Sequence, residues 1–171
     1  MDSYKNRAYL LVCDSFNVIL KTMSADMHGT IDANQLAEDH KAILQRVDDY
    51  LNKEHGTFST VDGYTLSDNC HSMAMLLAEH NVRDLAIKAF FLAFAILDAI
   101  EPSEMKDTYV TEHYLNMVIK CCDSPITGED EVLIDVIFNM ALHCTIANEP
   151  FVKDTIMNLH LAKRVEFQSP H

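Results

Sequence analysis

Apolar side chains recur at helical spacing along most of the chain, and the densest run lies within residues 84–100. Nine consecutive apolar residues there, from Ala89 to Leu97, mix bulky side chains with alanines. A helix that is apolar on all sides is either buried in a core or spans a membrane. The run is well short of the roughly 20 residues that a bilayer requires, and Lys88 and Asp98 bound it. The pattern therefore predicts a buried core helix and no membrane span.

Six further segments have apolar residues at helical spacing, and turn or capping signals separate them. Asp32 and Gln35 mark one helix start as a capping box, and Gly56 marks a stop. The sequence predicts an all-α fold of about seven helices in antiparallel hairpins, either a helical repeat or a bundle, forming one domain over residues 1–171. An ordered loop is expected at 56–65. The predicted helices cover residues 4–23, 32–55, 66–80, 84–100, 107–123, a segment capped by Thr127 and Asp130 up to 144, and 148–165.

The first predicted helix, residues 4–23, has more apolar surface than one packing face needs. Ala8, Leu11 and Ile19 repeat on one side, while other apolar residues widen that face. Such a helix either packs across the core or supplies a contact between copies of a homo-oligomer. The residues that widen the face are Tyr9, Leu10, Cys13, Phe16 and Leu20.

The hairpin at residues 70–98 resembles a tetratricopeptide repeat. Its residues follow the small, large, turn, small, aromatic, small order of that family at Ala74, Leu77, Asn81, Ala86, Phe90 and Ala93.

The resemblance implies a groove lined by the first helix of the hairpin, with Asp68, His71, Met75 and Glu79 facing a ligand. We therefore predict a non-enzymatic interaction module, an adaptor or small chaperone, that binds a peptide or a partner helix. A tetratricopeptide repeat is 34 residues long, and the position 34 residues after Ala86 is Lys120 rather than a small residue. The next hairpin therefore departs from a regular array.

The charge balance narrows the choice of partner. The chain has 26 acidic and 13 basic residues, which gives a formal net charge of -13. An acidic surface repels phosphate backbones, and no Lys/Arg run offsets it, so nucleic acid is not an expected partner. A basic or amphipathic protein segment fits this charge better.

Cysteine usage points to a reducing compartment. The chain has five cysteines, an odd count without a C-x-x-C motif, and no apparent secretory signal opens it. We expect a cytoplasmic protein with buried thiols rather than disulfides. Apolar helical sequence surrounds Cys13, Cys121, Cys122 and Cys144, and Cys70 lies in a more polar segment.

Two alternative functions involve metals. His40, His80, His113 and His143 each fall on the apolar stripe of a different predicted helix, where imidazoles and carboxylates could form the centre of a metal-dependent enzyme. However, the sequence has no H-E-x-x-H motif, no nucleophile motif and no glycine-rich phosphate loop. We therefore predict no catalytic residues and no cofactor.

The second metal alternative is calcium binding at residues 24–35, which resemble a degenerate EF-hand loop. Asp26, Gly29 and Asp32 match the third, sixth and ninth places of that loop. Ser24, His28 and Gln35 stand where the family has stronger oxygen ligands, above all the bidentate Glu at the twelfth place.

Overall fold

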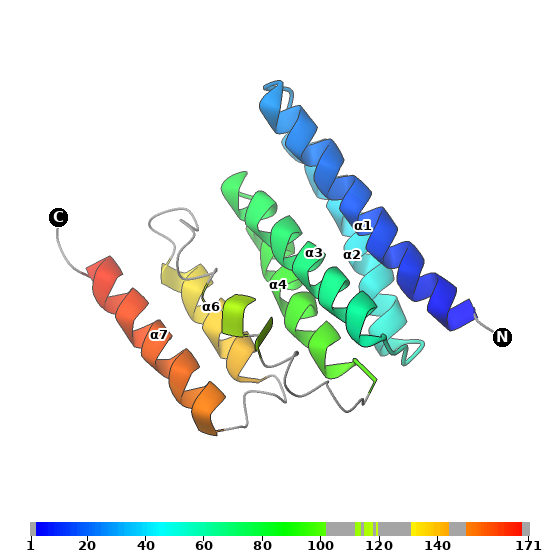
Figure 1. Ribbon diagram of the computed structural model, residues 1–171. Coiled ribbons are helices and arrows are strands. Elements are labelled where there is room, and N and C mark those ends of the chain that lie inside the picture. The colour runs from blue at the N-terminus through cyan, green and yellow to red at the C-terminus, as the bar shows by residue number, and fades with distance from the viewer. Residues whose placement is uncertain are drawn as a thin grey trace.

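The computed structural model describes residues 3–101, 112–113, 115–117, 119, 131–143 and 150–168, and the protein is all-α, as predicted (Figure 1). Among the described residues, the one β-type pairing is an isolated bridge between Phe58 and Ile100. None of the described helices is both long and apolar enough to cross a membrane. The helices are α1 (Ser3–Met27), α2 (Ala33–Asn52), α3 (Thr60–Glu79), α4 (Arg83–Asp98), α6 (Glu131–Leu142) and α7 (Pro150–Gln168).

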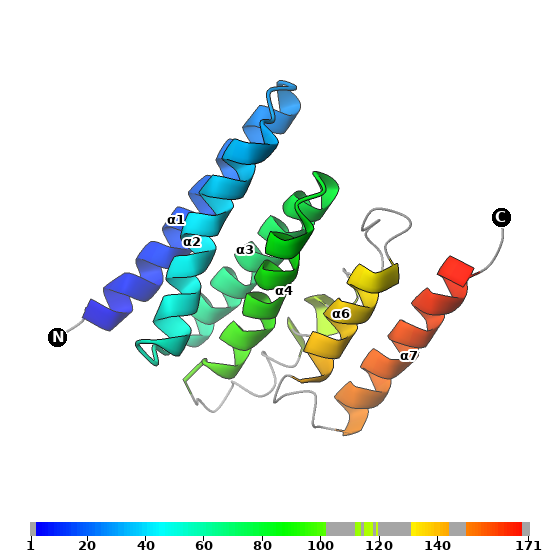
Figure 2. The same ribbon diagram turned by 180° about the vertical axis from the view of Figure 1, so that it is seen from behind.

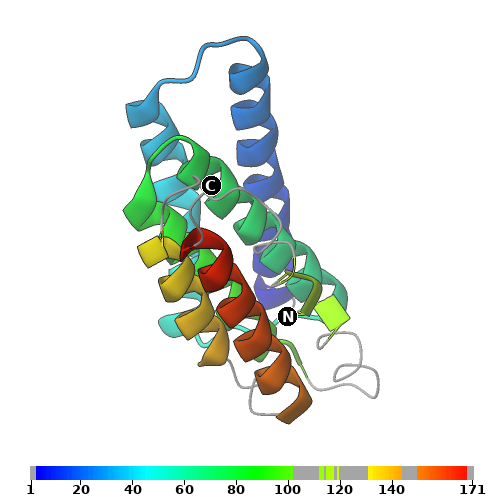
Figure 3. The same ribbon diagram turned by 90° about the vertical axis from the view of Figure 1, so that its left-hand side faces the viewer.

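Successive helices form antiparallel hairpins that stack side by side (Figures 1 and 2). The α1/α2 hairpin packs on the α3/α4 hairpin, α1 against α3 and α2 against α4, and α4 then contacts α6. Seen along the stack, α1 and α3 lie in one layer and α2 and α4 in the other (Figure 3). Helix α1 therefore lies at one end of the stack and α7 at the other.

Helix α4 is a core helix with eight buried residues, which confirms the prediction for residues 84–100. It packs against α2, α3 and α6, and each of these neighbours covers part of its surface. Ala89 and Ala93 allow close approach of the neighbouring helices, and Phe90 is completely buried. Phe91 is the exception, with 49% of its surface exposed.

Two helices end in the same kind of turn. Gly29, after α1, and Asn81, after α3, have positive φ angles of 65° and 63°. At both ends the next residue's N–H bonds to a carbonyl five residues back, from Thr30 to Ala25 and from Val82 to Leu77. This is the Schellman arrangement, which favours Gly or Asn in the left-handed conformation. The predicted turn at Asn81 is therefore confirmed.

The predicted loop at residues 56–65 is wrong in extent, because α3 already begins at Thr60. Ser59 caps this helix by accepting a hydrogen bond from the N–H of Asp62, at 3.2 Å, and Asp62 is favourable in the first turn of a helix. Helix α1 also continues beyond residue 23, to Met27, and α2 ends at Asn52, before Gly56.

The helical residues 112–113, 115–117 and 119 fall within the predicted helix 107–123. The rest of that prediction, and the predicted cap at Thr127 and Asp130, lie outside the described residues.

Candidate functional site

Helix α1 has two apolar faces, and only one of them is buried. Ala8, Leu11 and Ile19 enter the core, and the polar Ser15 and Thr22 are buried on the same side. A second row of apolar side chains lies on the outer side, where the exposed fraction is 59% for Tyr9 and 84% for Met27. We call this row the outer stripe. Its members are Tyr9, the half-buried Cys13, Phe16, Leu20, Met23 and Met27.

The outer stripe has the spacing of a coiled-coil seam. Its six residues follow one another in steps of four, three, four, three and four. This is the alternation of a and d positions in a heptad, which places one row of side chains toward a partner helix. The stripe extends over 19 residues, and the 18 steps between Tyr9 and Met27 span about 27 Å at 1.5 Å per residue. A continuous apolar row of this length on a surface is typical of an interaction site.

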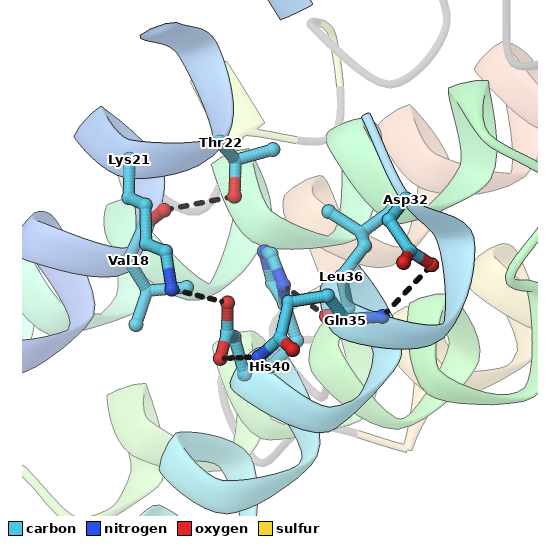
Figure 4. Close-up of polar contacts among 8 residues, drawn as sticks. Val18, Lys21, Thr22, Asp32, Gln35, Leu36 and His40 are labelled. Carbon is cyan, nitrogen blue, oxygen red and sulfur yellow. Dashed lines mark hydrogen bonds and ion pairs between the residues drawn. The ribbon is translucent and has the colours of Figure 1, made fainter. Parts of the chain in front are cut away.

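Ion pairs turn the charged residues of α1 away from the stripe. Arg46 of α2 lies 2.8 Å from Asp14, and Lys21 lies 2.9 Å from Asp39 of α2 (Figure 4). Asp26, near the end of α1, lies 3.4 Å from the His80 ring at the end of α3. Asp14, Lys21 and Asp26 are the only charged residues between positions 9 and 27. The stripe itself therefore carries no charge.

Buried hydrogen bonds fix the rotation of α1. The side-chain amide of Asn69, on α3, donates to the Ser15 hydroxyl at 2.9 Å and to the Val12 carbonyl at 3.2 Å. The Ser15 hydroxyl in turn donates to that carbonyl at 2.9 Å. Buried polar groups are costly unless paired, so turning the helix would break these bonds at a penalty. The stripe is thus held outward.

Tyr9, at the start of the stripe, stays neutral at physiological pH. The neighbouring Cys13 thiol raises the pKa of Tyr9 above its ordinary value of 10.0, and the Asp62 carboxylate adds a smaller effect in the same direction. The stripe therefore has an uncharged aromatic end in that range of pH.

The four residues expected to line a groove do share one side of α3, but they are not equally accessible. Glu79 is exposed, whereas Asp68 and Met75 are half-buried. His71 is buried, and its ring lies edge-on to Phe90 with the ring centroids 5.7 Å apart. In this structure His71 is a packing residue of the α3/α4 hairpin.

The four histidines considered as metal ligands lie in separate surroundings, away from the outer stripe. His40 is buried in α2, and its Nδ1 lies 2.8 Å from the Leu36 carbonyl (Figure 4). His80 faces Asp26, the His113 ring packs on Tyr64 at 4.5 Å, and His143 is exposed at the end of α6. No group of three or more His, Cys, Asp or Glu side chains suited to a metal occurs in the described part of the chain. This part of the structure therefore gives the metal-enzyme alternative no site.

The segment that resembles a calcium loop forms a helix end and a helix start. Ser24 and Asp26 are helical, so the first two ligand places do not lie in a loop. The Asp32 carboxylate accepts from the N–H groups of Asn34, at 2.9 Å, and Gln35, at 3.4 Å, as the predicted N-cap of α2. The Gln35 side chain donates to Asp39 rather than completing the capping box (Figure 4). These contacts explain the sequence pattern without calcium.

The described thiols differ from expectation in one respect. Cys70, in the more polar segment, is the buried one, and burial raises the pKa of Cys70 to about 12. Cys13, expected to be buried, is half-buried on the outer stripe. The other three cysteines lie outside the described residues.

The chain was compared with family models, curated proteins and solved structures, and no match was found in any of them. The tetratricopeptide resemblance therefore rests on the residues of the α3/α4 hairpin alone. The sequence alone indicates only part of the outer stripe. The apolar residues between Tyr9 and Leu20 signalled it, but the heptad spacing becomes clear once α1 is extended to Met27.

Proposed function

We propose that the protein is a helical interaction module that docks an amphipathic partner helix along the outer stripe of α1. The 4-3 spacing of an exposed, uncharged apolar row carries this proposal. A partner helix with matching apolar positions would remove both rows from water, which stabilises association by roughly 25 cal/mol for each Å² of apolar surface buried.

The architecture supports a scaffold of this kind. Helices α3 and α4 pack against each other, and the residues Ala74, Ala86, Ala93 and Phe90 of this hairpin are fully buried. Rigid stacked hairpins hold a docking helix in a fixed orientation, as adaptors and small chaperones of the tetratricopeptide type do. The docking surface proposed here is α1, in place of the α3 residues Asp68, His71, Met75 and Glu79.

The proposal includes a cytoplasmic location. The free thiols of Cys13 and Cys70 support a reducing compartment. The half-buried Cys13 thiol on the outer stripe would be open to oxidation in an oxidising compartment.

The experiment is a titration with a model helix. The probe is a fluorescein-labelled, charge-balanced peptide of about three heptads with Leu at a and d. Fluorescence anisotropy should show saturable binding to the intact protein, and Leu20→Glu should weaken binding at least about tenfold, because a carboxylate would be buried in the seam.

Phe91→Glu is the matched control, since Phe91 and Leu20 both have 49% of their surface exposed but Phe91 lies on α4. This variant should bind the peptide like the unchanged protein. Far-UV circular dichroism should show equal helicity in all three proteins. Saturable binding of equal affinity by Leu20→Glu and the unchanged protein would refute the docking surface.

A further inference from the structure

We infer that the helix docked on the outer stripe is α1 of a second copy of this chain, packed antiparallel to the first. The inference rests on the proposed docking surface and specifies its occupant. Three observations support it: the absence of charge on the stripe, the order of side-chain sizes along it, and the position of α1 at the end of the stack.

The charge distribution favours a second copy. With a formal charge of -13, two copies repel one another over most of their surface. The outer stripe has no charged residue of its own, because Asp14 and Lys21 are engaged with α2 and Asp26 faces His80. The Asp62 carboxylate of α3 lies near Tyr9, at one end of the stripe. Along the rest of its length, the stripe offers a basic helix no carboxylate to recognise. An uncharged face thus selects a partner whose own seam is uncharged, and α1 itself meets that requirement.

The sizes of the stripe residues favour an antiparallel pair. The steps between successive stripe residues are the same from either end of the stripe, and position 18 is its midpoint. Antiparallel pairing about that point sets a positions against d positions: Tyr9 meets Met27, and Phe16 meets Leu20. The smallest residue, Cys13, meets the long, adaptable Met23, so no layer is left underfilled.

A parallel pair in register would instead set each residue against itself. Phe16 would face Phe16 of the second copy, and Cys13 would face Cys13. The small Cys13 layer would then be underfilled between overfilled layers at Tyr9 and Phe16. Close packing disfavours both conditions, so the antiparallel arrangement fits the sequence better.

The position of α1 leaves room for a second copy. Helix α1 lies at one end of the stack, with α2 and α3 on its other sides (Figures 1 and 3). No described helix covers the stripe. The opposite end, α7, also exposes Phe151, Met157 and Leu161, but the exposed Lys153 and Asp154 lie among them. A contact from α1 to α7 would be heterologous and would add further copies without limit unless it closed into a ring.

The first test is the molar mass of the full chain in solution, measured by light scattering with size-exclusion chromatography. We expect about twice the 19.4 kDa mass of one chain at micromolar concentrations. Phe16→Glu combined with Leu20→Glu should halve the measured mass. Both side chains are about half exposed, so the variant should keep its helicity.

Phe151→Glu is the control at the other end of the stack and should leave a dimer. A monomeric unchanged protein at tens of micromolar would overturn the inference. So would a dimer that Phe151→Glu dissociates and the α1 variant does not.

The second test fixes the register by oxidation. In an antiparallel pair the two Cys13 residues are ten positions apart along the helix axis, about 15 Å, which is beyond disulfide reach. In the Met23→Cys variant, the introduced thiol should lie opposite Cys13 of the second copy. Oxidation should then give a covalent dimer whose 13–23 linkage is identified by peptide mass spectrometry.

Adding Cys13→Ser to that variant should abolish the linkage. A Cys13–Cys13 disulfide as the main product of the unchanged protein would overturn the antiparallel register.

The model-helix titration separates this inference from the proposed function. If the protein is monomeric but binds the peptide, and Leu20→Glu weakens that binding, the docking surface stands and the second copy is wrong. If the protein is monomeric and does not bind the peptide, both proposals fail.

Discussion

Phe58 and Ile100 form a backbone bridge that closes the loop before α3 onto the end of α4. The Phe58 N–H donates to the Ala99 carbonyl at 3.0 Å, and the Glu101 N–H donates to the Phe58 carbonyl at 2.8 Å. Both bridge side chains are buried. The bridge anchors the loop over the first turns of α3, and Gly63 makes the close approach possible.

Gly63→Ala should destabilise the protein even though alanine favours helix. An added Cβ would lie 2.4 Å from Cγ1 and 2.7 Å from Cδ1 of Ile100. Overpacking typically costs about 1–3 kcal/mol. The helix preference of Ala over Gly offsets at most about 1 kcal/mol of that cost. Urea unfolding should show a net loss of about 1–2 kcal/mol. Pairing the change with Ile100→Val should reduce the loss, and a gain in stability from Gly63→Ala alone would contradict the packing at this seam.

Phe90→Ala tests whether α4 is central to the core. Phe90 is fully buried, and emptying such a site typically costs about 3–5 kcal/mol. Phe91→Ala, at the adjacent position, should cost less than about 1 kcal/mol, because that ring is half exposed. Chemical unfolding of the two variants gives the comparison. Similar losses at both positions would mean that the buried face of α4 is assigned incorrectly.

The sequence predicts features that depend on nearby residues. The nine-residue apolar run identifies α4 as a core helix, and Asp32 and Asn81 mark a cap and a turn through their own backbone preferences. The sequence does not mark the start of α3 at Thr60, because the apolar spacing before Leu66 is weak. The Ser59 cap satisfies only backbone donors, and a serine is equally typical of a loop.

Features that depend on distant residues could not be derived. Periodicity shows that α1 has more apolar surface than one packing face needs, but the positions of α2 and α3 decide which part of it is covered. The bonds that fix this choice join residues far apart in the chain, such as Asn69 with Ser15 and Arg46 with Asp14. His71 likewise appears as a groove residue in the repeat pattern, and only the packing of α4 reveals it as buried.

Asn69→Ala should loosen α1 from α3. The change removes two donated hydrogen bonds and leaves the buried Ser15 hydroxyl with one fewer partner. Leaving a buried polar group unsatisfied costs about 1–3 kcal/mol. Hydrogen exchange should accelerate in α1 more than in α4. The free energy of unfolding should fall by the same amount, about 1–3 kcal/mol. Asn52→Ala is the control, since that amide bonds to Asp48 at an exposed position and should cost less than about 0.5 kcal/mol. Unchanged exchange in α1 would show that Asn69 does not hold the helix.

His40 should make the protein less stable in mild acid. Burial lowers the pKa of His40 below its ordinary value of 6.5, against the smaller opposing effects of the Leu36 carbonyl and Asp39. The unfolded chain therefore takes up the proton more readily than the folded one. The contribution of His40 to the free energy of unfolding is fully present above about pH 6.5 and is lost as the pH falls below it, by at most about 1.4 kcal/mol per pH unit for one proton.

The lowered pKa of Asp39 acts in a separate range, because its contribution to the free energy of unfolding is lost only as the pH falls through 3.8 and below. Urea unfolding at pH 7.5, 6.5 and 5.5 should show a smaller decline in His40→Leu than in the unchanged protein. Equal declines in both proteins would mean that His40 is protonated as easily in the folded state as in the unfolded chain.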